Sequence, residues 1–423
     1  MKLVIVTFTI TAAAVGGAFS KLDGANDDIG PEHRKLQTDL LTLIPTLSPS
    51  FYPTYYINNA DTDPVSSLRP STNPTARPTM PCTRSFTVAM YDSIEEDIAT
   101  LTRDIEDEED RTHFLGGIVR LAAHDFMDFD PSSFAPMGSD GCFDPDHPRN
   151  AGLDDIWCDD DCPLTVLHRT KYSHISRADF WVVCANAVIY QTSVDNALDM
   201  RDTFRWGRKD RDSCIGSGQR LPRPSGCQQI EAVFLRKMGL SWREAVALLG
   251  AHTLGRGDRD FSGHHGTWKD SNEDAQVFDK QYFVELSTNA WRMRNVGGPD
   301  NGGAPQDWTT GRSGDQMMLN TDVCLLYDID ENVDTGTPCC AVTDSTFPEG
   351  ENQCIEQEAA SRRCSRYSQN DSRRAAGRAV IEYGDGDDNS NFYSAFREAW
   401  TKATTLGHSN LSPLEWPCDS EYW

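Results

Sequence analysis

The sequence VALLGAHTLGR at residues 246–256 has the features of a buried helix that ends at a histidine. Ser241 and Glu244 stand just before this apolar run at the spacing of an N-terminal capping box, which predicts where the helix begins. His252 follows the run directly. A lone histidine at a helix end is more often a satisfied terminal residue than a ligand, so other segments must decide its role.

A second segment, RLAAHD at residues 120–125, places Arg120 and His124 four residues apart. On one helix these two side chains project from the same face. A salt-bridged surface pair has the same spacing, but the neighbouring residues are small and apolar, which favours a helix pressed against a flat, buried group. The apolar face of a helix over residues 112–127 would be formed by Phe114, Ile118, Leu121 and Ala122.

Helical patterns dominate the sequence after residue 82. Ser176 and Asp179 precede the apolar run 180–190 as the start of another capped helix. Alternating strand patterns are scarce, and no repeat of solenoid or propeller length occurs. The sequence therefore predicts an all-α fold.

The first residues have the composition of a secretory signal peptide, which we place at residues 1–20. Met1 and Lys2 precede an apolar run at residues 3–15, and small residues follow at the usual cleavage spacing. The run is shorter than the roughly 20 apolar residues that a membrane-spanning helix needs, which argues against a membrane anchor. We therefore expect a secreted, extracellular protein.

The rest of the chain divides by composition. Residues 21–81, rich in Pro, Ser and Thr from residue 43 onward, are expected to be disordered, and residues 82–423 to form one catalytic domain. Within that domain the polar, glycine-rich and cysteine-bearing stretch 328–388 predicts a long surface insertion. Asn370 and Asn410 begin N-glycosylation sequons, which agrees with surface placement and export.

The charge balance limits the partners. The chain has 65 acidic and 39 basic residues and a formal net charge of -26, so a nucleic-acid partner is not expected. An acidic surface of this kind attracts cations, but it is equally the solvated coat of a soluble secreted protein.

The thirteen cysteines predict a disulfide framework, because exported chains fold in an oxidising compartment. Six bridges leave one thiol, and Cys184 within an apolar stretch is the expected free one, since an unpaired cysteine packs well as a small hydrophobe. Cysteine metal clusters are disfavoured because no paired Cys-x-x-Cys or Cys/His ligand spacing is present.

The two histidine segments together resemble the distal and proximal segments of the plant, fungal and bacterial haem peroxidase superfamily. Four further segments match in the family's order: NAGL at 150–153, GRKD at 207–210, RLP at 220–222 and MMLNTD at 317–322. The resemblance covers about residues 93–326 and resumes at 392–407. It implies a two-lobed helical fold with haem b bound between a distal and a proximal lobe.

On the proximal side the resemblance makes His252 the axial ligand of the haem iron. Its other ring nitrogen would contact Asp322, which raises the basicity of the ligand and favours cleavage of the O–O bond. Arg256 matches a basic position near a haem propionate, although an exposed cation at a helix end fits equally well.

On the distal side the resemblance makes His124 the general base and then the general acid toward hydrogen peroxide. Arg120 would stabilise negative charge on the departing oxygen. Asn150 would hold the imidazole of His124 in one tautomer through its far nitrogen.

The sequence departs from the family at several positions. Ala123 replaces the usual aromatic residue before the distal histidine, which predicts a roomier pocket. Trp268, in the segment SGHHGTW, resembles the proximal tryptophan of cytochrome c and ascorbate peroxidases rather than a core residue alone. Phe261 stands where ascorbate peroxidases carry a substrate-binding arginine, and His113 and Gly117 stand where manganese-binding members carry carboxylates.

Two cation sites are implied by the same resemblance, with calcium or potassium as the expected ions. The proximal site would use oxygen ligands from Thr253, Asp274, Val277 and Asp279, although a solvated acidic loop would have the same composition. A distal calcium site would use Asp125, Gly138 and Asp140. There Cys142 replaces a serine ligand, and sulfur is a poor ligand for calcium.

We therefore expect a monomeric, secreted peroxidase that reduces hydrogen peroxide to water and oxidises a small organic donor of the phenolic type. One alternative is a secreted haem-binding or matrix protein that kept the fold without efficient turnover. Intact Arg120, His124 and Asn150 argue against it. A zinc hydrolase that uses His252, His264 and His265 is disfavoured because it lacks a carboxylate ligand of the expected kind.

Overall fold

The computed structural model describes residues 86–296, 306–310, 316–327, 338–340 and 374–415. Helices predominate among them, as predicted. The predicted signal peptide, the Pro/Ser/Thr-rich segment, Asn370 and most of the predicted insertion lie outside the described residues. Asn410 is exposed, as its sequon requires.

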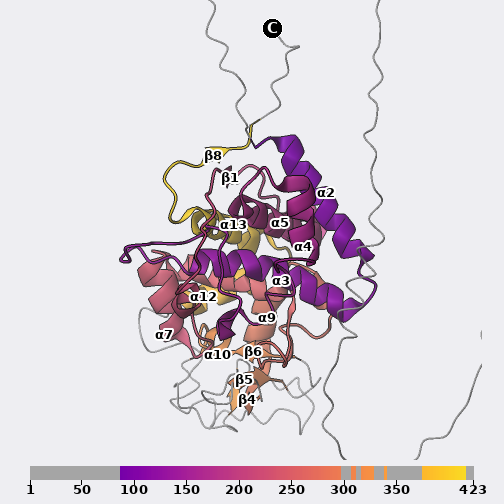
Figure 1. The fold of residues 1–423 in the computed structure, drawn as a ribbon. Helices are drawn as coiled ribbons and strands as arrows, with labels where there is room; N and C mark the ends of the chain where they lie inside the picture. Colours follow the sequence, from indigo (N-terminus) through magenta and orange to yellow (C-terminus); the bar gives the residue numbers. More distant parts are fainter. Residues whose placement is uncertain (1–85, 297–305, 311–315, 328–337, 341–373, 416–423) are drawn as a thin grey trace, which may run out of the picture. The chain divides into compact units, whose positions relative to one another are not determined.

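The distal part of the domain is built on three long helices, α2 (Val88–Asp104), α3 (Glu108–Met127) and α5 (Arg177–Thr192), which pack against one another (Figure 1). Each begins at a residue whose side chain accepts a hydrogen bond from a backbone N–H of the first turn, so free donors at the helix ends are satisfied. The shorter segments here are η1 (Pro148–Asn150), α4 (Pro163–Leu167), η2 (His168–Tyr172), η3 (Val194–Asn196) and α6 (Ser217–Arg220).

The proximal part centres on α8 (Trp242–Leu249), which continues into η5 (Gly250–Thr253). Both hydrogen bonds of the predicted Ser241–Glu244 capping box are present. Helices α12 and α13 pack on α8, and α12 also packs on α9. The remaining bounds are α7 (Cys227–Ile230), η4 (Glu231–Lys237), η6 (Asp274–Gln276), α9 (Gln281–Thr288), α10 (Asn320–Val323), α12 (Arg374–Gly384) and α13 (Ser390–Thr405).

Helix α12 corrects the prediction of a surface insertion over residues 328–388. Ala376, Val380 and Tyr383 are buried on one face of this helix, at the three- and four-residue spacing of a core-facing stripe. Residues 374–384 are therefore part of the proximal core. The prediction was wrong for them because the polar residues on either side hid a short apolar period.

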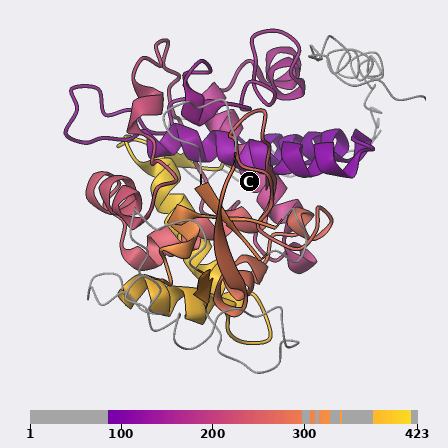
Figure 2. The ribbon, with the colours of Figure 1, turned by 90° about the horizontal axis from the view of Figure 1, so that it is seen from below.

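The strands are short and antiparallel. A four-stranded sheet in the order β6-β5-β4-β7 lies at the lower end of Figure 1 and faces the viewer in Figure 2. The longest strand has six residues, so alternation of polar and apolar residues was too brief to predict this sheet. The bounds are β1 (Arg205–Trp206) with β8 (Ser412–Pro413), β2 (Arg256–Gly257) with β3 (Gly266–Thr267), and the sheet strands β4 (Ala290–Asn295), β5 (Gln306–Thr309), β6 (Met318–Leu319) and β7 (Pro338–Cys340).

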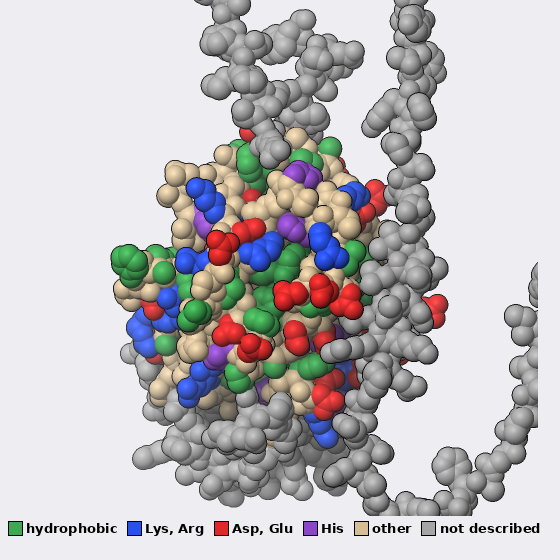
Figure 3. All heavy atoms as spheres, viewed as in Figure 1, with side chains coloured by type: hydrophobic (Ala, Val, Ile, Leu, Met, Phe, Trp, Pro, Cys, Tyr) green, Lys and Arg blue, Asp and Glu red, His purple; other side chains and the backbone are tan. Residues whose placement is uncertain are grey.

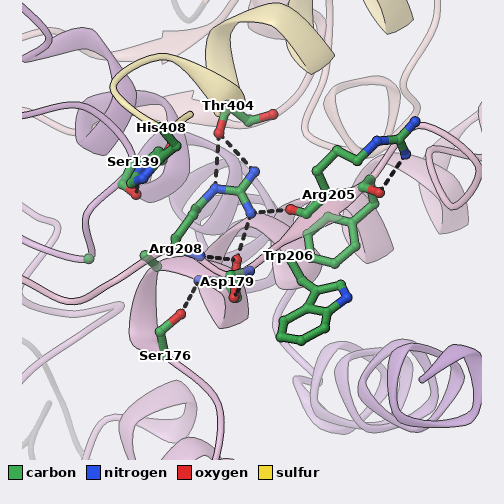
Figure 4. Close-up of polar contacts among 12 residues, drawn as sticks. Ser139, Ser176, Asp179, Arg205, Trp206, Arg208, Thr404 and His408 are labelled. Atoms are coloured by element: carbon green, nitrogen blue, oxygen red, sulfur yellow. Dashed lines mark hydrogen bonds and ion pairs between the residues drawn. The ribbon is translucent and has the colours of Figure 1, made fainter. Parts of the chain in front are cut away.

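A buried ion pair explains the GRKD segment (Figure 4). Arg208 donates to Asp179 Oδ1 at 2.7 Å, and both side chains are almost fully buried. The same guanidinium donates twice to the carbonyl of Thr404 at the end of α13. The side chain of Asp179 therefore pairs with Arg208 instead of completing a capping box with Ser176. Through Arg208 it connects α5 to the end of α13. A buried pair of this kind is tolerated because its remaining polar atoms are also hydrogen-bonded.

Two glycines let α3 approach the segment that follows His252. A Cβ atom on Gly116 would lie 2.6 Å from the Cα of Gly255, and the reverse substitution would be as close. Gly255 also has φ of +88°, which favours glycine. These two positions bring the two histidine-bearing segments together at one edge.

The described cysteines include the bridges Cys142–Cys214, Cys158–Cys162 and Cys227–Cys324. Cys184 is unpaired and buried, as predicted. Among the described helices, none has the length and apolar character needed to span a bilayer. Acidic and basic side chains occur in neighbouring groups on the face shown in Figure 3, so that face is not uniformly acidic despite the net charge.

Candidate active site

A cavity of about 300 Å³ opens between α3 and the α8–η5 segment. His124 lines it from the first segment and His252 from the second, so the structure brings together the two histidines that the sequence singled out. Its apolar lining includes Phe126, Phe234, Leu248, Leu249, Leu254 and Met317. Histidines from two separate helical segments and apolar walls form the donor set that suits a flat metallo-macrocycle, so these residues fit a haem.

The distal group consists of Arg120, His124 and Asn150. His124 Nδ1 lies 2.8 Å from Asn150 Oδ1, and the amide nitrogen of Asn150 donates to the Asp144 carbonyl, which leaves the amide oxygen as the acceptor for the imidazole. His124 therefore carries its proton on Nδ1, and its Nε2 is the basic atom. Arg120 Nε donates to that Nε2 at 3.3 Å.

The guanidinium of Arg120 is held by backbone carbonyls rather than by a carboxylate. Its two terminal nitrogens donate to Ala151 O at 2.9 Å and to Arg149 O at 3.0 Å. Burial lowers the pKa of Arg120 to about 10, so the group stays positively charged at neutral pH. Burial and the charge of Arg120 lower the pKa of His124 to about 3, which keeps this imidazole neutral and able to accept a proton.

The proximal group is organised by one buried carboxylate, that of Asp322. Its Oδ1 lies 2.8 Å from His252 Nδ1, and its Oδ2 accepts from Trp268 Nε1 at 2.8 Å. The rings of His252 and Trp268 stack with centroids 4.3 Å apart. The structure thus assembles the three proximal residues that the sequence proposed from three separate segments.

Tyr282 belongs to the same group and was missed by sequence reasoning. Its hydroxyl donates to Asp322 Oδ1 at 2.8 Å from α9, and the Leu319 amide donates to Oδ2 at 2.7 Å. No local motif marks Tyr282, because it reaches Asp322 only through the packing of α9. Burial by itself would raise the pKa of Asp322, but the charge and hydrogen bond of His252 outweigh burial and hold this pKa below its usual value.

Several positions at which the sequence departs from the family line the cavity. Ala123 lines the cavity, as does Phe261, whose ring centroid is 5.5 Å from that of His113. Arg256 also lines it and forms an ion pair with Glu109, so it is a nearly buried residue at the cavity edge rather than an exposed helix-end cation.

Two of the residues predicted to bind a proximal metal cation contact the side chain of Lys269. Val277 O and Asp279 Oδ1 each accept a hydrogen bond of 2.9 Å from the ammonium group of Lys269. Thr253 donates to Asp279, and Asp274 Oδ2 accepts from Ser271 at 2.7 Å. A positive charge of the chain itself is therefore bonded to two of the four predicted ligands. The signal in the sequence was the lysine directly after Trp268.

The distal calcium site stays a prediction, and the structure shows what its residues contact. Asp125 accepts backbone amides through both oxygens, from Asp140, Gly141 and Cys142, while Asp140 pairs with Arg211 at 2.6 Å. The amide of Gly138 donates to Asp128. The residues meet as predicted. Backbone N–H groups engage both oxygens of Asp125, whereas Asp140 Oδ1 is buried and has no hydrogen-bond partner among the described residues.

The described part of the chain contains no group of three or more His, Cys, Asp or Glu side chains arranged to hold a metal ion. This also bears on the zinc alternative. His252 contacts Asp322, whereas His264 lies 3.5 Å from the buried Asp307, so the two histidines have separate partners.

Comparison with known proteins places these features in a family. The pattern of the peroxidase family matches residues 99–331, which is more than half of the chain. The mitochondrial cytochrome c peroxidase of Pyricularia oryzae is 31% identical over 250 residues, 56% of this chain and 62% of the relative. That of Emericella nidulans is 32% identical over 247 residues, with 56% and 61% covered.

A cytosolic L-ascorbate peroxidase of Oryza sativa subsp. japonica is 31% identical over 176 residues, which cover 40% of this chain and 63% of the relative. The chain thus spans about three fifths of the length of the curated relatives it matches. The matched region contains both histidine segments and the aspartate that the proximal histidine contacts.

Proposed function

The chain belongs to the haem peroxidase superfamily, and on that premise we propose that it is an enzyme that reduces hydrogen peroxide to water while it oxidises a small organic donor of the phenolic type. One observation carries the proposal. Arg120 and His124 lie on one wall of a cavity whose other wall holds His252. This is the arrangement required for acid–base catalysis beside a histidine-bound metal.

His252 would hold haem b through its Nε2, because its Nδ1 is engaged by Asp322. When bound, the haem would supply iron that accepts an oxygen atom from peroxide and then takes electrons from the donor. The carboxylate of Asp322 keeps the proton of His252 on Nδ1 and increases the electron donation of Nε2. The hydrogen bonds from Trp268 and Tyr282 fix that carboxylate in place.

His124 would move the proton. Its neutral Nε2 would take a proton from one oxygen of hydrogen peroxide and return it to the other oxygen, which leaves as water. Asn150 keeps Nδ1 protonated throughout, so the ring does not need to change its tautomer before the transfer. Arg120 is held at its far end by two carbonyls, and it stabilises the negative charge that develops on the departing oxygen.

The small organic donor is supported by the cavity edge. Phe261 and His113 present neighbouring rings there, which suits an aromatic donor, and Phe261 takes the place of a substrate-binding arginine. His113 and Gly117 line the same edge without a carboxylate pair for manganese.

A second candidate donor is a basic redox protein. Residues 106–110 form an exposed, entirely acidic run at the start of α3, and Glu109 within it pairs with the cavity-lining Arg256. Such a surface attracts a cationic partner electrostatically. The relatives named cytochrome c peroxidase support this candidate.

Export from the cell is part of the proposal. The composition of residues 1–20 supports a signal peptide, and the disulfide bonds of the described domain agree with an oxidising compartment. Mass spectrometry of the N-terminus and glycans of the protein recovered from culture medium would test this. Recovery only inside cells would contradict it.

The proposal is tested by one optical experiment followed by donor assays. The purified haem-bound protein should change its absorption spectrum on addition of hydrogen peroxide and return to the starting spectrum with guaiacol. A protein that binds haem but shows no change would be a matrix protein without turnover.

Donor choice is resolved by a charge reversal. Glu106→Lys with Asp110→Lys should lower the rate with reduced cytochrome c and leave the guaiacol rate unchanged if a basic protein is the donor. Equal rates with cytochrome c before and after the substitutions would favour the small donor.

A further inference from the structure

Lys269 places its ammonium group among the oxygen atoms that the sequence assigned to a proximal metal cation. Nζ donates to Val277 O at 2.9 Å and to Asp279 Oδ1 at 2.9 Å. The side chain is only 2% exposed, although lysine is among the residues least often buried. Two of the four expected ligand groups are therefore already bonded to a positive charge that the chain carries.

A metal ion and this ammonium group exclude each other. Calcium binds oxygen at about 2.3–2.6 Å, which is closer than the ammonium nitrogen lies to the same two oxygens, so both would occupy the same space. A metal ion and an ammonium group bound to the same two oxygens would also repel each other strongly in a buried site. The ammonium satisfies the same oxygens with hydrogen bonds of ordinary length.

We propose that Lys269 replaces the proximal metal ion: its ammonium group is a cation tethered to the chain, and it makes the proximal half of the site independent of dissolved calcium or potassium. This property goes beyond the peroxidase activity proposed above, and it concerns the protein with or without a donor substrate.

The carboxylate that binds Lys269 also organises the proximal site. Asp279 Oδ1 accepts from Lys269 Nζ, from Thr253 Oγ1 at 2.9 Å and from the Gln281 amide at 2.9 Å. Thr253 directly follows His252, and Lys269 directly follows Trp268. One oxygen atom therefore ties together the two segments whose rings stack beneath the cavity, and Lys269 acts as a positioning residue for that stack.

The charges of the cluster balance. A buried ammonium is tolerated only when it is paired and hydrogen-bonded, and Asp279 meets both conditions. Burial lowers the pKa of Lys269, while the charges of Asp279 and Asp274 and the hydrogen bond to Asp279 oppose that effect. Loss of the lysine would leave Asp279 with an unbalanced negative charge, which an added metal ion could neutralise.

The experiment measures thermal unfolding of the full-length protein in tetramethylammonium buffer with chelator, with and without added potassium or calcium chloride. Lys269→Thr introduces an oxygen ligand and leaves room for an ion, so its melting temperature should fall by about 5–10 °C and recover when potassium or calcium is added. Lys269→Met fills the space without charge or donor, so its fall should persist in both salts. Wild type should respond to neither salt at this site.

Lys280→Thr is the matched control, because Lys280 is only half-buried and donates to the carbonyls of Asp385 and Gly386 in the same part of the domain. Its salt response should equal that of wild type, including any response from ions bound elsewhere. An identical salt response in Lys269→Thr and wild type would overturn the proposal. If Lys269→Thr does not fold, an unchanged melting temperature in Lys269→Met would overturn it equally, whereas a salt-insensitive fall would support it.

Discussion

The two cavity histidines are the same side chain placed in opposite electrostatic surroundings. His124 lies beside a buried guanidinium and an amide, and burial together with Arg120 lowers its pKa to about 3. His252 lies against the buried carboxylate of Asp322. His124 is therefore kept neutral, whereas Nε2 of His252 is made more electron-rich. The partner of Nδ1, rather than the imidazole itself, determines which task each histidine performs.

The largest effect should come from removing the proximal histidine. His252→Ala deletes the imidazole that is bonded to Asp322 and lines the cavity, so haem binding or activity should be abolished. The haem absorption band of the purified variant measures this. His174→Ala, at an exposed position, is the control and should retain the band. An unchanged band and rate in His252→Ala would remove this residue from the site.

The distal histidine should affect rate without affecting binding. His124→Leu introduces an apolar side chain of similar size and removes the base, so the reaction with peroxide should slow by about 10²–10⁴-fold while haem stays bound. Stopped-flow absorption after mixing with hydrogen peroxide measures the rate. Equal rates in variant and wild type would exclude His124 from the proton transfer.

Sequence reasoning succeeded where a group is local and failed where it is assembled. Arg120 and His124 share one helix, so their spacing alone predicted a common face. Tyr282 and Lys269 reach their carboxylates through tertiary packing, and no periodicity in the sequence encodes that approach. The family motifs gave His252, Trp268 and Asp322, but a motif describes the ligands of a relative. The motifs therefore did not predict that Lys269 would replace the ion.

The fold shows the same division. The capped helices α5 and α8 begin where the sequence predicted, because capping uses residues three apart in the chain. Helix α12 and the four-stranded sheet were missed, since eleven helical residues amid polar sequence and strands of two to six residues carry weak periodic signals. Both are stabilised by neighbours that are distant in sequence.

A pH profile should sharpen the contrast between the histidines. Because the pKa of His124 lies near 3, the base is neutral from pH 8 to pH 5 and the peroxide rate should be flat there, falling only as the pH approaches 3. The free energy of unfolding should also decrease as the pH falls, because the unfolded chain binds the proton more readily. The folded pKa lies below the unfolded value, so this contribution is present above about pH 6.5 and is lost progressively as the pH falls toward 3.

Arg120→Leu tests the cause of that low pKa. Burial is the larger cause and would remain, but the repulsion from the guanidinium would be lost, so the acid limb of the rate profile should move to higher pH. The absolute rate falls for a separate reason, the loss of charge stabilisation, and therefore only the position of the limb is diagnostic. A limb that stays in place would show that Arg120 does not influence the titration of His124.

The smallest effect concerns Trp268, which shares Asp322 with His252. An adjacent carboxylate stabilises positive charge on an indole, so peroxide should produce a tryptophan-centred radical in a detectable fraction of molecules. Lys269 carries a positive charge in the next residue, but Asp279 pairs with it and offsets most of its field. Electron paramagnetic resonance of peroxide-treated wild type and Trp268→Phe measures the radical.

The two neighbouring charges provide the decisive comparison for this radical. Trp268→Phe removes the oxidisable ring and should abolish the tryptophan signal, whereas Lys269→Met removes the positive charge and leaves Asp279 unbalanced, which should increase the signal. Identical spectra in wild type and Trp268→Phe would show that the indole only packs against His252. A signal that is present in wild type but unaffected by Lys269→Met would show that Asp322 alone determines the field at the ring, because it is the carboxylate bonded to the indole nitrogen.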